Sequence, residues 1–408
     1  MRNRPVQFTD VWIPYGGYWS TPFCAWQGSF ATLPPIPFAA ETAVKALAAR
    51  GVGPTDIDGV CLGTTVPSKH SFYGAPWFAG LAGLCHVSGP TINQACATSV
   101  RCLVQAAEEL GANGASLYLA ATADRTSNGP HVFYPNPSGP GGTGDAENLV
   151  LDSFGHDPYA KNSMIQTAEN VAREAGITRE AQEEIALLRF RQYATALSAD
   201  AAFLKRFMPW PVEVKDARGK KVVATVAGDQ GVYPTTAEGL ATLKPVLDGG
   251  TVTFGTQTHP ADGNAAMLLT SSRERARELA RDGAVDVQLA SFGQARVKKG
   301  FMPMAVVPAA RLALERAEIG PADLVSVTTH NPFAVNDVYL ARELALDPER
   351  MNRRGCSLVW GHPQGPTGMR AIIELIEDLA EQGGGFGLFT GCAAGDSAAA
   401  VVVKVSVR

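Results

Sequence analysis

The feature that most constrains the fold is a pattern that occurs twice, early and late in the chain. Residues 92–123 are INQACATSVRCLVQAAEELGANGASLYLAATA, and residues 359–393 are VWGHPQGPTGMRAIIELIEDLAEQGGGFGLFTGCA. Each stretch has the end of a strand, a chemically distinctive residue, small residues, an amphipathic helix with an acidic last turn, a glycine and a buried strand. The repetition predicts two similar halves related by a pseudo-twofold axis. Two strand ends and two helix N-termini would then face each other.

Helix and strand patterns alternate on both sides of a long central region. In the last third, strands predicted over 285–292 and 323–329 alternate with helices predicted over 308–318 and 335–345. A continuous apolar run at 115–123 is typical of a strand that is buried on both faces. The alternation therefore predicts an α/β fold with a parallel sheet that is covered by helices on both sides.

The central region differs from the two flanking regions in composition and in its predicted secondary structure. It begins with many turn-forming residues, contains a long helical stretch over 161–200, and includes basic segments. We interpret it as an inserted loop domain that lies over the sheets. The predicted division is a first half at 1–124, a loop domain at 125–250 and a second half at 251–408.

Composition excludes several classes of protein. The 408 residues are 46% hydrophobic and 18% charged, which is typical of a globular protein. A net charge of -4 does not indicate the excess of positive charge that is typical of proteins that bind nucleic acid. Neither a membrane span nor a signal peptide is evident, so we expect a cytoplasmic protein. The seven cysteines are irregularly spaced and form no CxxC pair, so we expect no metal site.

Cys96 lies between a short strand and a helix predicted over 97–110. A helix N-terminus carries partial positive charge and unpaired N–H groups, which favour a thiolate over a thiol. Because the thiolate is the nucleophilic form, this position predicts an activated nucleophile that accepts an acyl group. The alternative is a buried cysteine at a tight packing point.

Three further residues lie where a ligand can reach them. His362, in the bent loop GHPQGPTG, is placed to accept and return a proton, or else is a structural loop histidine. Cys392, in the small-residue turn GCAAGDSA, can act as an acid or base, or else is simply buried. Asn331 follows a buried strand, where α/β sheets build sites, or else is a turn residue. We expect its neighbour His330 to have a supporting or structural role.

The segment TQTHPADGNAAMLL holds another group of polar residues. Thr258 and His259 are placed to line a ligand channel. Asp262 and Gly263 are predicted to form a turn before a buried strand.

Taken together, these stretches resemble the thiolase family. The resemblance runs from TPFCAWQGSFATLPP through NQACATS, TAENVAREAGITREAQEEIA, VPAARLALERAEIGPADL, HNPFA and GHPQGPTG to GLFTGCAAG, which is nearly the whole chain. The order Cys96, Asn331, His362, Cys392 is specific, whereas no single motif is. The resemblance implies a five-layered αβαβα fold with two similar halves and an inserted loop domain. It also implies a homodimer or a tetramer.

The resemblance further implies CoA-dependent thiolytic cleavage of a 3-oxoacyl-CoA, with CoA as co-substrate and no metal. His362 would take the proton of Cys96, and Cys96 would attack the 3-oxo carbonyl. Cys392 would protonate the leaving enolate, which would lie in an oxyanion hole made by His362 and a water held by Asn331. A second oxyanion hole would use the backbone N–H groups of Cys96 and Ala394.

The chain departs from the family pattern at positions that line the acyl and pantetheine channels. Pro332 follows Asn331 where the family usually has glutamate. Ser163 and Met164 replace a His-Met pair, and Thr258 stands in for a serine. The resemblance implies that Met164 and Thr258 contact the CoA-linked substrate, and the departures predict that acetoacetyl-CoA is not the best substrate.

Aromatic residues crowd the segments YGGYWSTPFCAW, HSFYGAPWF and HVFYP. Aromatic residues usually belong to cores and interfaces. The other interpretation is a pocket for a bulky or aromatic acyl group, as in thiolases of aromatic-compound degradation such as the one that cleaves benzoylsuccinyl-CoA. That group would imply a small partner subunit with a zinc ribbon and an OB fold.

Basic residues in the loop region suggest a further contact. Lys205 and Arg206, in LKRF, are predicted to meet the phosphates of CoA, with a solvated surface segment as the alternative. Two other functions stay open. One is a condensing enzyme similar to ketoacyl synthases, and the other is a thiolase-like subunit that binds acyl-CoA without catalysis.

Overall fold

The computed structural model describes residues 8–112, 116–208, 211–216 and 218–408. Its main sheet has the strand order β13-β14-β15-β12-β1-β11-β6-β4-β5, and β2 and β3 also pair with β11. The strands are β1 (Trp12–Ile13), β2 (Tyr18–Ser20), β3 (Cys24–Ala25), β4 (Gly59–Gly63), β5 (Thr91–Ile92), β6 (Leu117–Arg125), β11 (Ala261–Thr270), β12 (Val285–Arg296), β13 (Leu324–His330), β14 (Gly384–Ala393) and β15 (Ser397–Val407).

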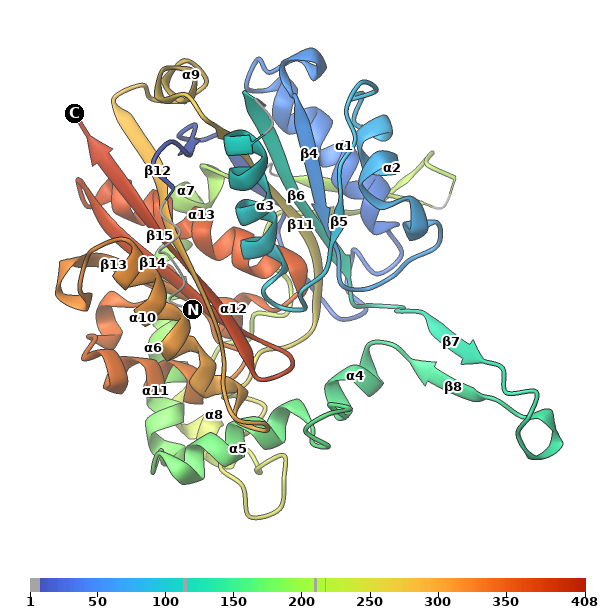
Figure 1. Cartoon of the computed structure of the whole chain (residues 1–408). Coiled ribbons are helices and arrows are strands. Elements are labelled where there is room, and N and C mark those ends of the chain that lie inside the picture. The colour runs from blue at the N-terminus through green and yellow to red at the C-terminus, as the bar shows by residue number, and fades with distance from the viewer. Residues whose placement is uncertain (1–7, 113–115, 209–210, 217) are drawn as a thin grey trace.

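Helices cover both sides of this sheet and fill the space between its two halves (Figure 1). The outer helices of the first half, α1 and α2, pack on β4, β6 and β11, and those of the second half, α10 and α11, lie beyond β12, β14 and β15. The inner helices, α3 and α13, contact each other. Their bounds are α1 (Pro35–Ala48), α2 (Gly74–Leu81), α3 (Thr98–Ala112), α10 (Val306–Arg316), α11 (Ala334–Leu344) and α13 (Gly365–Glu381).

Alternating side chains on the central strands show why the layers form. Both faces of β6 and of β15 are buried, and successive residues enter different core clusters. On β15, one face packs beneath α10 and the other packs towards α13, with the residues Ala398, Ala400 and Val402 on the first face and Ala399, Val401 and Val403 on the second. The predicted five-layered αβαβα arrangement is confirmed.

The sheet is mixed, so the prediction of a parallel sheet is wrong for most of its strands. Only β4 with β5, β4 with β6, and β13 with β14 run parallel. For β6 with β11 and for β12 with β15, the antiparallel direction is set by pairing between distant segments of the chain. For β14 with β15 the reason is the length of the connection. The three residues between β14 and β15 allow only a hairpin, and a hairpin joins antiparallel strands.

Asp262 and Gly263 lie within β11, so the predicted turn at these residues is wrong. Asp262 pairs with Arg125 of β6, and its carboxylate accepts the N–H of Ser127 at 2.9 Å. A Cβ at Gly263 would lie 2.5 Å from the ring of Phe23. The glycine therefore permits close packing against the strand and does not serve a turn.

The predicted repeat corresponds to α3 and α13, which meet at their N-terminal ends in the centre of the molecule (Figure 1). The Ser99 hydroxyl donates to the carbonyl of Gly365, and the Asp124 carboxylate accepts the N–H of Gly365 at 2.8 Å. A Cβ at Gly368 would lie 3.2 Å from the Cβ of Ser99, so the two helices approach closely. The pseudo-twofold arrangement therefore faces the two helix starts towards each other.

The segment between β6 and β11 contains a projecting hairpin and several helices (Figure 1). Thr178 caps α6 by accepting the N–H of Ala181 at 3.2 Å. The three-part division at residues 124 and 250 stays a prediction. The strand β11 lies in the predicted second half by residue number, but it pairs with β6 of the first half. The elements are β7 (His131–Tyr134), β8 (Asp145–Asn148), α4 (Leu151–Gly155), α5 (Met164–Glu174), α6 (Arg179–Ala196), α7 (Ser198–Lys205), β9 (Val212–Lys215), β10 (Val222–Val226) and α8 (Ala237–Thr242).

The remaining helices of the second half are short. They are α9 (Arg273–Glu278) and α12 (Ser357–Trp360). Within the described ranges, no helix has the length and apolar character needed to cross a membrane.

Candidate active site

A tight turn between β5 and α3 presents Cys96. The Thr98 hydroxyl accepts the N–H of Gln94 at 2.9 Å and donates to the carbonyl of Ala95 at 2.7 Å. Ala95 has a left-handed φ of 45°, which only a tightly held turn imposes on a residue other than glycine. The local sequence therefore places the thiol just ahead of the first turn of α3.

His362 lies in the loop between α12 and α13. Its backbone N–H donates to the backbone carbonyl of His259 at 2.9 Å, and its ring Nδ1 lies 2.6 Å from the hydroxyl of Thr367. The preceding Gly361 has a φ of 92°, and a Cβ there would lie 2.7 Å from the His259 ring. These contacts hold the imidazole with Nε2 free to face Cys96.

The two halves bring Cys96 and His362 together. The Sγ of Cys96 lies 3.3 Å from Nε2 of His362 and 3.4 Å from Oε1 of Gln364. The backbone N–H groups of Ala394 and of Cys96 itself lie near enough to the sulfur to act towards a lower pKa of the thiol. A thiol, an imidazole and two backbone donors therefore converge from three distant parts of the chain.

Burial decides the charge state of this pair. It raises the pKa of the Cys96 thiol to about 12, although the N–H groups of Ala394 and Cys96 act in the opposite direction. Burial, and then the neighbouring His330, hold the pKa of His362 well below its usual range. The predicted shift of Cys96 towards thiolate stays a prediction, and burial of the sulfur opposes it because desolvation disfavours the charged form. Burial therefore favours a neutral thiol beside a neutral imidazole.

Cys392 lies near the end of β14, two residues before Ala394. The Nδ2 of Asn336 donates to its sulfur at 3.2 Å. Burial raises the pKa of the Cys392 thiol, and the proximity of Cys96 raises it further. The second thiol is therefore buried in the neighbourhood of the first and is also protonated.

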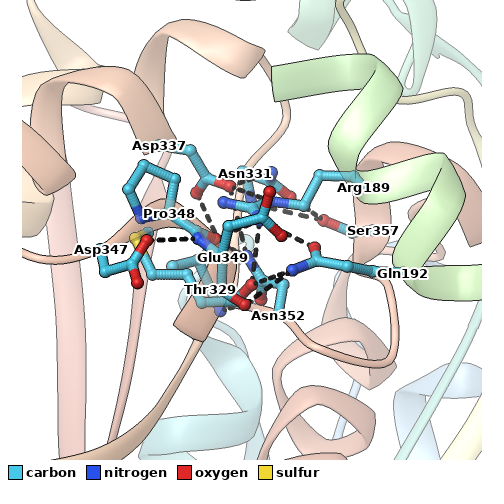
Figure 2. A network of polar contacts seen from close by, with 11 residues as sticks. Arg189, Gln192, Thr329, Asn331, Asp337, Asp347, Pro348, Glu349, Asn352 and Ser357 are labelled. Atoms are coloured by element: carbon cyan, nitrogen blue, oxygen red, sulfur yellow. Dashed lines mark hydrogen bonds and ion pairs between the residues drawn. The ribbon is translucent and has the colours of Figure 1, made fainter. Parts of the chain in front are cut away.

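Asn331 follows β13, and a buried ion pair fixes its amide (Figure 2). Its Nδ2 donates to Asp337 Oδ2 at 3.0 Å, and that carboxylate also binds Nε of Arg189 at 2.7 Å. Both charged side chains are fully buried. Pro332 replaces the glutamate expected after Asn331, and Asp337 is the carboxylate that holds the amide here. No contact within the described residues joins Asn331 directly to Cys96.

His330 lies closer to the centre of the site than its predicted supporting role suggests. Its ring stacks on that of His362, with centroids 4.1 Å apart and an interplanar angle of 27°. Its Nδ1 lies 3.1 Å from the hydroxyl of Ser357. Burial lowers the pKa of His330 to about 3, so the ring is neutral.

Thr258 and Met164 lie at the borders of this region. The Thr258 N–H donates to the carbonyl of Pro332 at 2.8 Å, and its hydroxyl donates to the carbonyl of Ser357. Met164 is the first residue of α5 and packs against the core cluster that contains Cys392. Thr258 therefore lies beside the loop that contains Asn331. Met164 belongs to α5, in the region between β6 and β11.

The side chains of Lys205 and Arg206 do not lie next to Cys96. Lys205 pairs with Asp200, and Arg206 pairs with Glu381 at 2.6 Å. Glu381 ends α13, whose start is at the site, and the 17-residue helix puts about 24 Å between these ends. The predicted contact of these two cations with CoA phosphates stays a prediction that the pairings do not support.

Several residues of the site were missed by the sequence argument. Gln364 and Thr367 lie in or directly after the motif that contains His362, so their position offered a signal. Arg189 and Asp337 offered none, because their pairing depends on a contact across 148 residues. The same holds for Asp124, whose carboxylate contacts Gly365.

Comparison with known families covers most of the chain. Residues 18–273 match the thiolase N-terminal domain, and residues 284–405 match the thiolase C-terminal domain. The chain belongs to the thiolase family. It is therefore an enzyme of the acyltransferase type.

This thiolase is similar to proteins of known name along nearly its whole length. It is 30% identical to an acetyl-CoA acetyltransferase of Cupriavidus necator over 92% of this chain and 95% of that protein. It is also 30% identical to a 3-ketoacyl-CoA thiolase of Bacillus subtilis over 93% and 95% of the two chains. Among solved structures, an acetyl-CoA acetyltransferase of Bacillus anthracis matches with a TM-score of 0.88 and 26% identity, covering 97% of this chain and 98% of that one.

The neutral state of Cys96 predicts how it reacts with iodoacetamide. Only the thiolate is alkylated, and a pKa of about 12 leaves a small thiolate fraction that grows about tenfold per pH unit. The rate at the Cys96 peptide, followed by mass spectrometry, should therefore rise from pH 7 to pH 10 without levelling off. A free cysteine peptide is the control and should level off above about pH 8.5. A plateau for Cys96 below pH 7 would instead indicate a thiolate–imidazolium pair.

The buried ion pair predicts a large effect on stability. Asp337→Asn leaves the Arg189 guanidinium buried without a counter-charge, so we expect the free energy of unfolding to fall by about 3–5 kcal/mol. Urea unfolding would measure the change. Glu343→Gln, which breaks the exposed pair with Arg311, is the matched control and should change it by at most about 1 kcal/mol. Equal effects of both substitutions would contradict the structural role of the buried pair.

Proposed function

We propose that this thiolase catalyses the CoA-dependent cleavage of a 3-oxoacyl-CoA through an acyl-Cys96 intermediate. The observation that carries the proposal is the 3.3 Å contact between Sγ of Cys96 and Nε2 of His362. The names of the relatives, acetyl-CoA acetyltransferase and 3-ketoacyl-CoA thiolase, agree with this chemistry. They do not favour a condensing enzyme or a non-catalytic binding subunit.

In the first half-reaction, His362 Nε2 accepts the proton of Cys96 while the sulfur attacks the 3-oxo carbonyl carbon. Because burial disfavours the charged forms of both groups, we propose that the proton moves as the sulfur–carbon bond forms. The N–H groups of Cys96 and Ala394 then stabilise the negative oxygen of the tetrahedral adduct. Each such donor contributes about 3–4 kcal/mol to stabilisation of the transition state in comparable enzymes.

Collapse of the adduct breaks the bond between C2 and C3. The leaving acetyl-CoA-type enolate receives hydrogen bonds from His362 Nε2–H and from a water. In this proposal the Asn331 amide, which donates one Nδ2 hydrogen to Asp337, uses the other to hold that water. Cys392 then gives its proton to the enolate carbon and leaves acetyl-CoA as product.

In the second half-reaction, the thiol of free CoA attacks the acyl-Cys96 thioester, and Cys392 takes the CoA proton. The new acyl-CoA leaves, and Cys96 regains its proton from His362. One thioester replaces another, so the exchange is nearly isoergic and the whole reaction is reversible. Two thiols in one buried site suit these two roles, one as nucleophile and one as acid and base.

We further propose that Ala394, Thr258 and Met164 border the bound CoA thioester. Ala394 lies at the reacting sulfur, and Thr258 lies beside the loop of Asn331. We retain Lys205 and Arg206 as candidates for contact with CoA phosphates only in a conformation that opens their present ion pairs.

The acyl group is proposed to be bulky or aromatic, and acetoacetyl-CoA is proposed not to be the best substrate. The support is the set of substitutions at Pro332, Ser163 and Thr258. The aromatic segments contribute less, since Trp19 and Phe23 are buried in the core and Phe72 is exposed. A homodimer or tetramer in the cytoplasm, with a small OB-fold and zinc-ribbon partner, completes the proposal.

Substitution of the two thiols tests the mechanism. Cys96→Ser should abolish CoA-dependent cleavage and the mass increase on incubation with acyl-CoA. Cys392→Ser keeps the acyl acceptor but loses the acid and base, so turnover should fall about 10²–10⁴-fold while Cys96 can still be acylated. Intact mass spectrometry and the loss of 3-oxoacyl-CoA absorbance give the two readouts. Cys85→Ser, at an exposed thiol, is the control; acylation of the Cys96→Ser protein at another residue would refute the assignment.

A substrate panel tests the proposed acyl group. Linear 3-oxoacyl-CoA substrates of increasing length and aromatic ones are offered to the isolated chain, and kcat/KM is compared. We expect aromatic or bulky substrates to exceed acetoacetyl-CoA by at least about tenfold, in line with the altered pocket positions. Turnover that appears only after a partner subunit is added would support the two-subunit form. A preference for acetoacetyl-CoA would reject the bulky acyl group and leave the acyl-Cys96 mechanism in place.

A further inference from the structure

We propose that Cys96, His330 and His362 form a binding site for a soft divalent metal ion such as Zn²⁺, which occupies the resting site and blocks the thiol. The proposal concerns the binding of an ion to the free protein and does not require the proposed acyl transfer. The ion is not needed for the chemistry; it would compete with any group that reacts at Cys96.

The first support is the convergence of three suitable ligand atoms. The sulfur of Cys96 and one ring nitrogen from each histidine all lie within 4.8 Å of one another. Zn²⁺ and Co²⁺ prefer thiolate and imidazole among protein side chains, so binding of the ion releases the proton of the Cys96 thiol to the solvent. The three residues come from separate segments, which is why the spacing of cysteines along the chain does not reveal the site.

The second support is the orientation of the His330 ring, which a chain of hydrogen bonds holds. Asp337, ion-paired with Arg189, can only accept, so the Asn331 amide must direct its Nδ2 to Asp337 and its Oδ1 to Ser357 (Figure 2). The Ser357 hydroxyl then donates to Asn331 Oδ1 at 3.3 Å. The same hydroxyl oxygen accepts the backbone N–H of Asn331 at 3.3 Å and lies 3.1 Å from Nδ1 of His330. The ring of His330 is therefore held through Nδ1, and Nε2 is the nitrogen left to bind a ligand.

The free ring nitrogen of His330, Nε2, is buried. His330 is fully buried, and its Nε2 has no hydrogen-bond partner in the part of the chain that the structure describes. A buried polar atom without a partner is destabilising, so a group that binds it stabilises the site. The site as described thus contains an unsatisfied ligand atom next to a thiol and a second imidazole.

His362 has the same arrangement. Its Nδ1 is held by the hydroxyl of Thr367, and its Nε2 faces the Cys96 sulfur at 3.3 Å. Metal-binding histidines characteristically have their other ring nitrogen held by an oxygen atom in this way. Each ring is therefore held through its Nδ1 atom, that of His330 by Ser357 and that of His362 by Thr367.

The geometry needs a small adjustment to accept the ion. Tetrahedral Zn²⁺ with bonds of about 2.0–2.3 Å separates its ligand atoms by about 3.3–3.6 Å. The sulfur and Nε2 of His362 already meet this separation. The stacked rings must tilt so that their lone pairs converge, and the fourth position is left for a water. Gln364 Oε1, 3.4 Å from the same sulfur, is placed to accept a hydrogen bond from that water.

Titration of the metal-free full-length chain with Co²⁺ tests the proposal, because a Co²⁺–thiolate bond gives a charge-transfer band in the near ultraviolet. We expect one ion per chain and loss of the band after Cys96 is blocked with iodoacetamide. His330→Asn keeps a donor for Ser357 but removes the Nε2 ligand, so binding should weaken at least about tenfold. Zn²⁺ should displace Co²⁺ and slow alkylation of Cys96.

Control variants separate this site from other thiols. Cys85→Ser removes an exposed thiol and should leave the band unchanged, whereas Cys96→Ser should remove it. Thermal unfolding of each variant checks that it is folded. A band that persists in Cys96→Ser, or equal affinity in His330→Asn and the unaltered chain, would overturn the proposal. A chain that binds Co²⁺ in this way but cleaves no 3-oxoacyl-CoA would retain the metal site and reject only the proposed function.

Discussion

The arrangement of the molecule depends on one buried carboxylate, that of Asp124. It accepts the N–H groups of Thr65 and Val66 in the first half and of Gly365 at the start of α13, at 2.8–3.0 Å. Burial raises the pKa of Asp124 to about 6, and these N–H groups oppose that shift. The helix N-terminus at Gly365 also favours a negative charge. Because this contact joins the two helix starts, Cys96 of one half and His362 of the other lie 3.3 Å apart.

Low polarity around the site determines its chemical state. The same burial that brings Cys96, His362 and Cys392 together removes the water that would stabilise charge on any of them. At rest the site is therefore a set of neutral groups, and charge develops only when a polar ligand or an ion brings its own counter-charge. Fixed donors such as the N–H of Ala394 are already in place for that event.

The region between β6 and β11 orients residues of the site through direct contacts. Arg189 of α6 reaches Asp337 of α11, and through it orients Asn331 and the Ser357–His330 chain. A second buried pair, Arg370 with Asp229 at 2.7 Å, ties the same region to α13. Two buried ion pairs are costly to form, and the further hydrogen bonds of their partners offset part of that cost. The orientation of the polar groups in the site thus depends on contacts with this region.

Whereas the layer order was implied only by the resemblance to the thiolase family, the amino-acid sequence by itself indicated the two similar halves and the positions of Cys96, His362 and Cys392 at turns and helix starts. These features follow from periodicity, glycine and turn residues, which act over a few neighbouring positions. Only the tertiary structure decided the direction of most strands, the place of Asp262 within β11, the protonation of the thiol and the nearness of His330. Those features depend on burial and on contacts between residues far apart in the chain, and local sequence carries no signal for either.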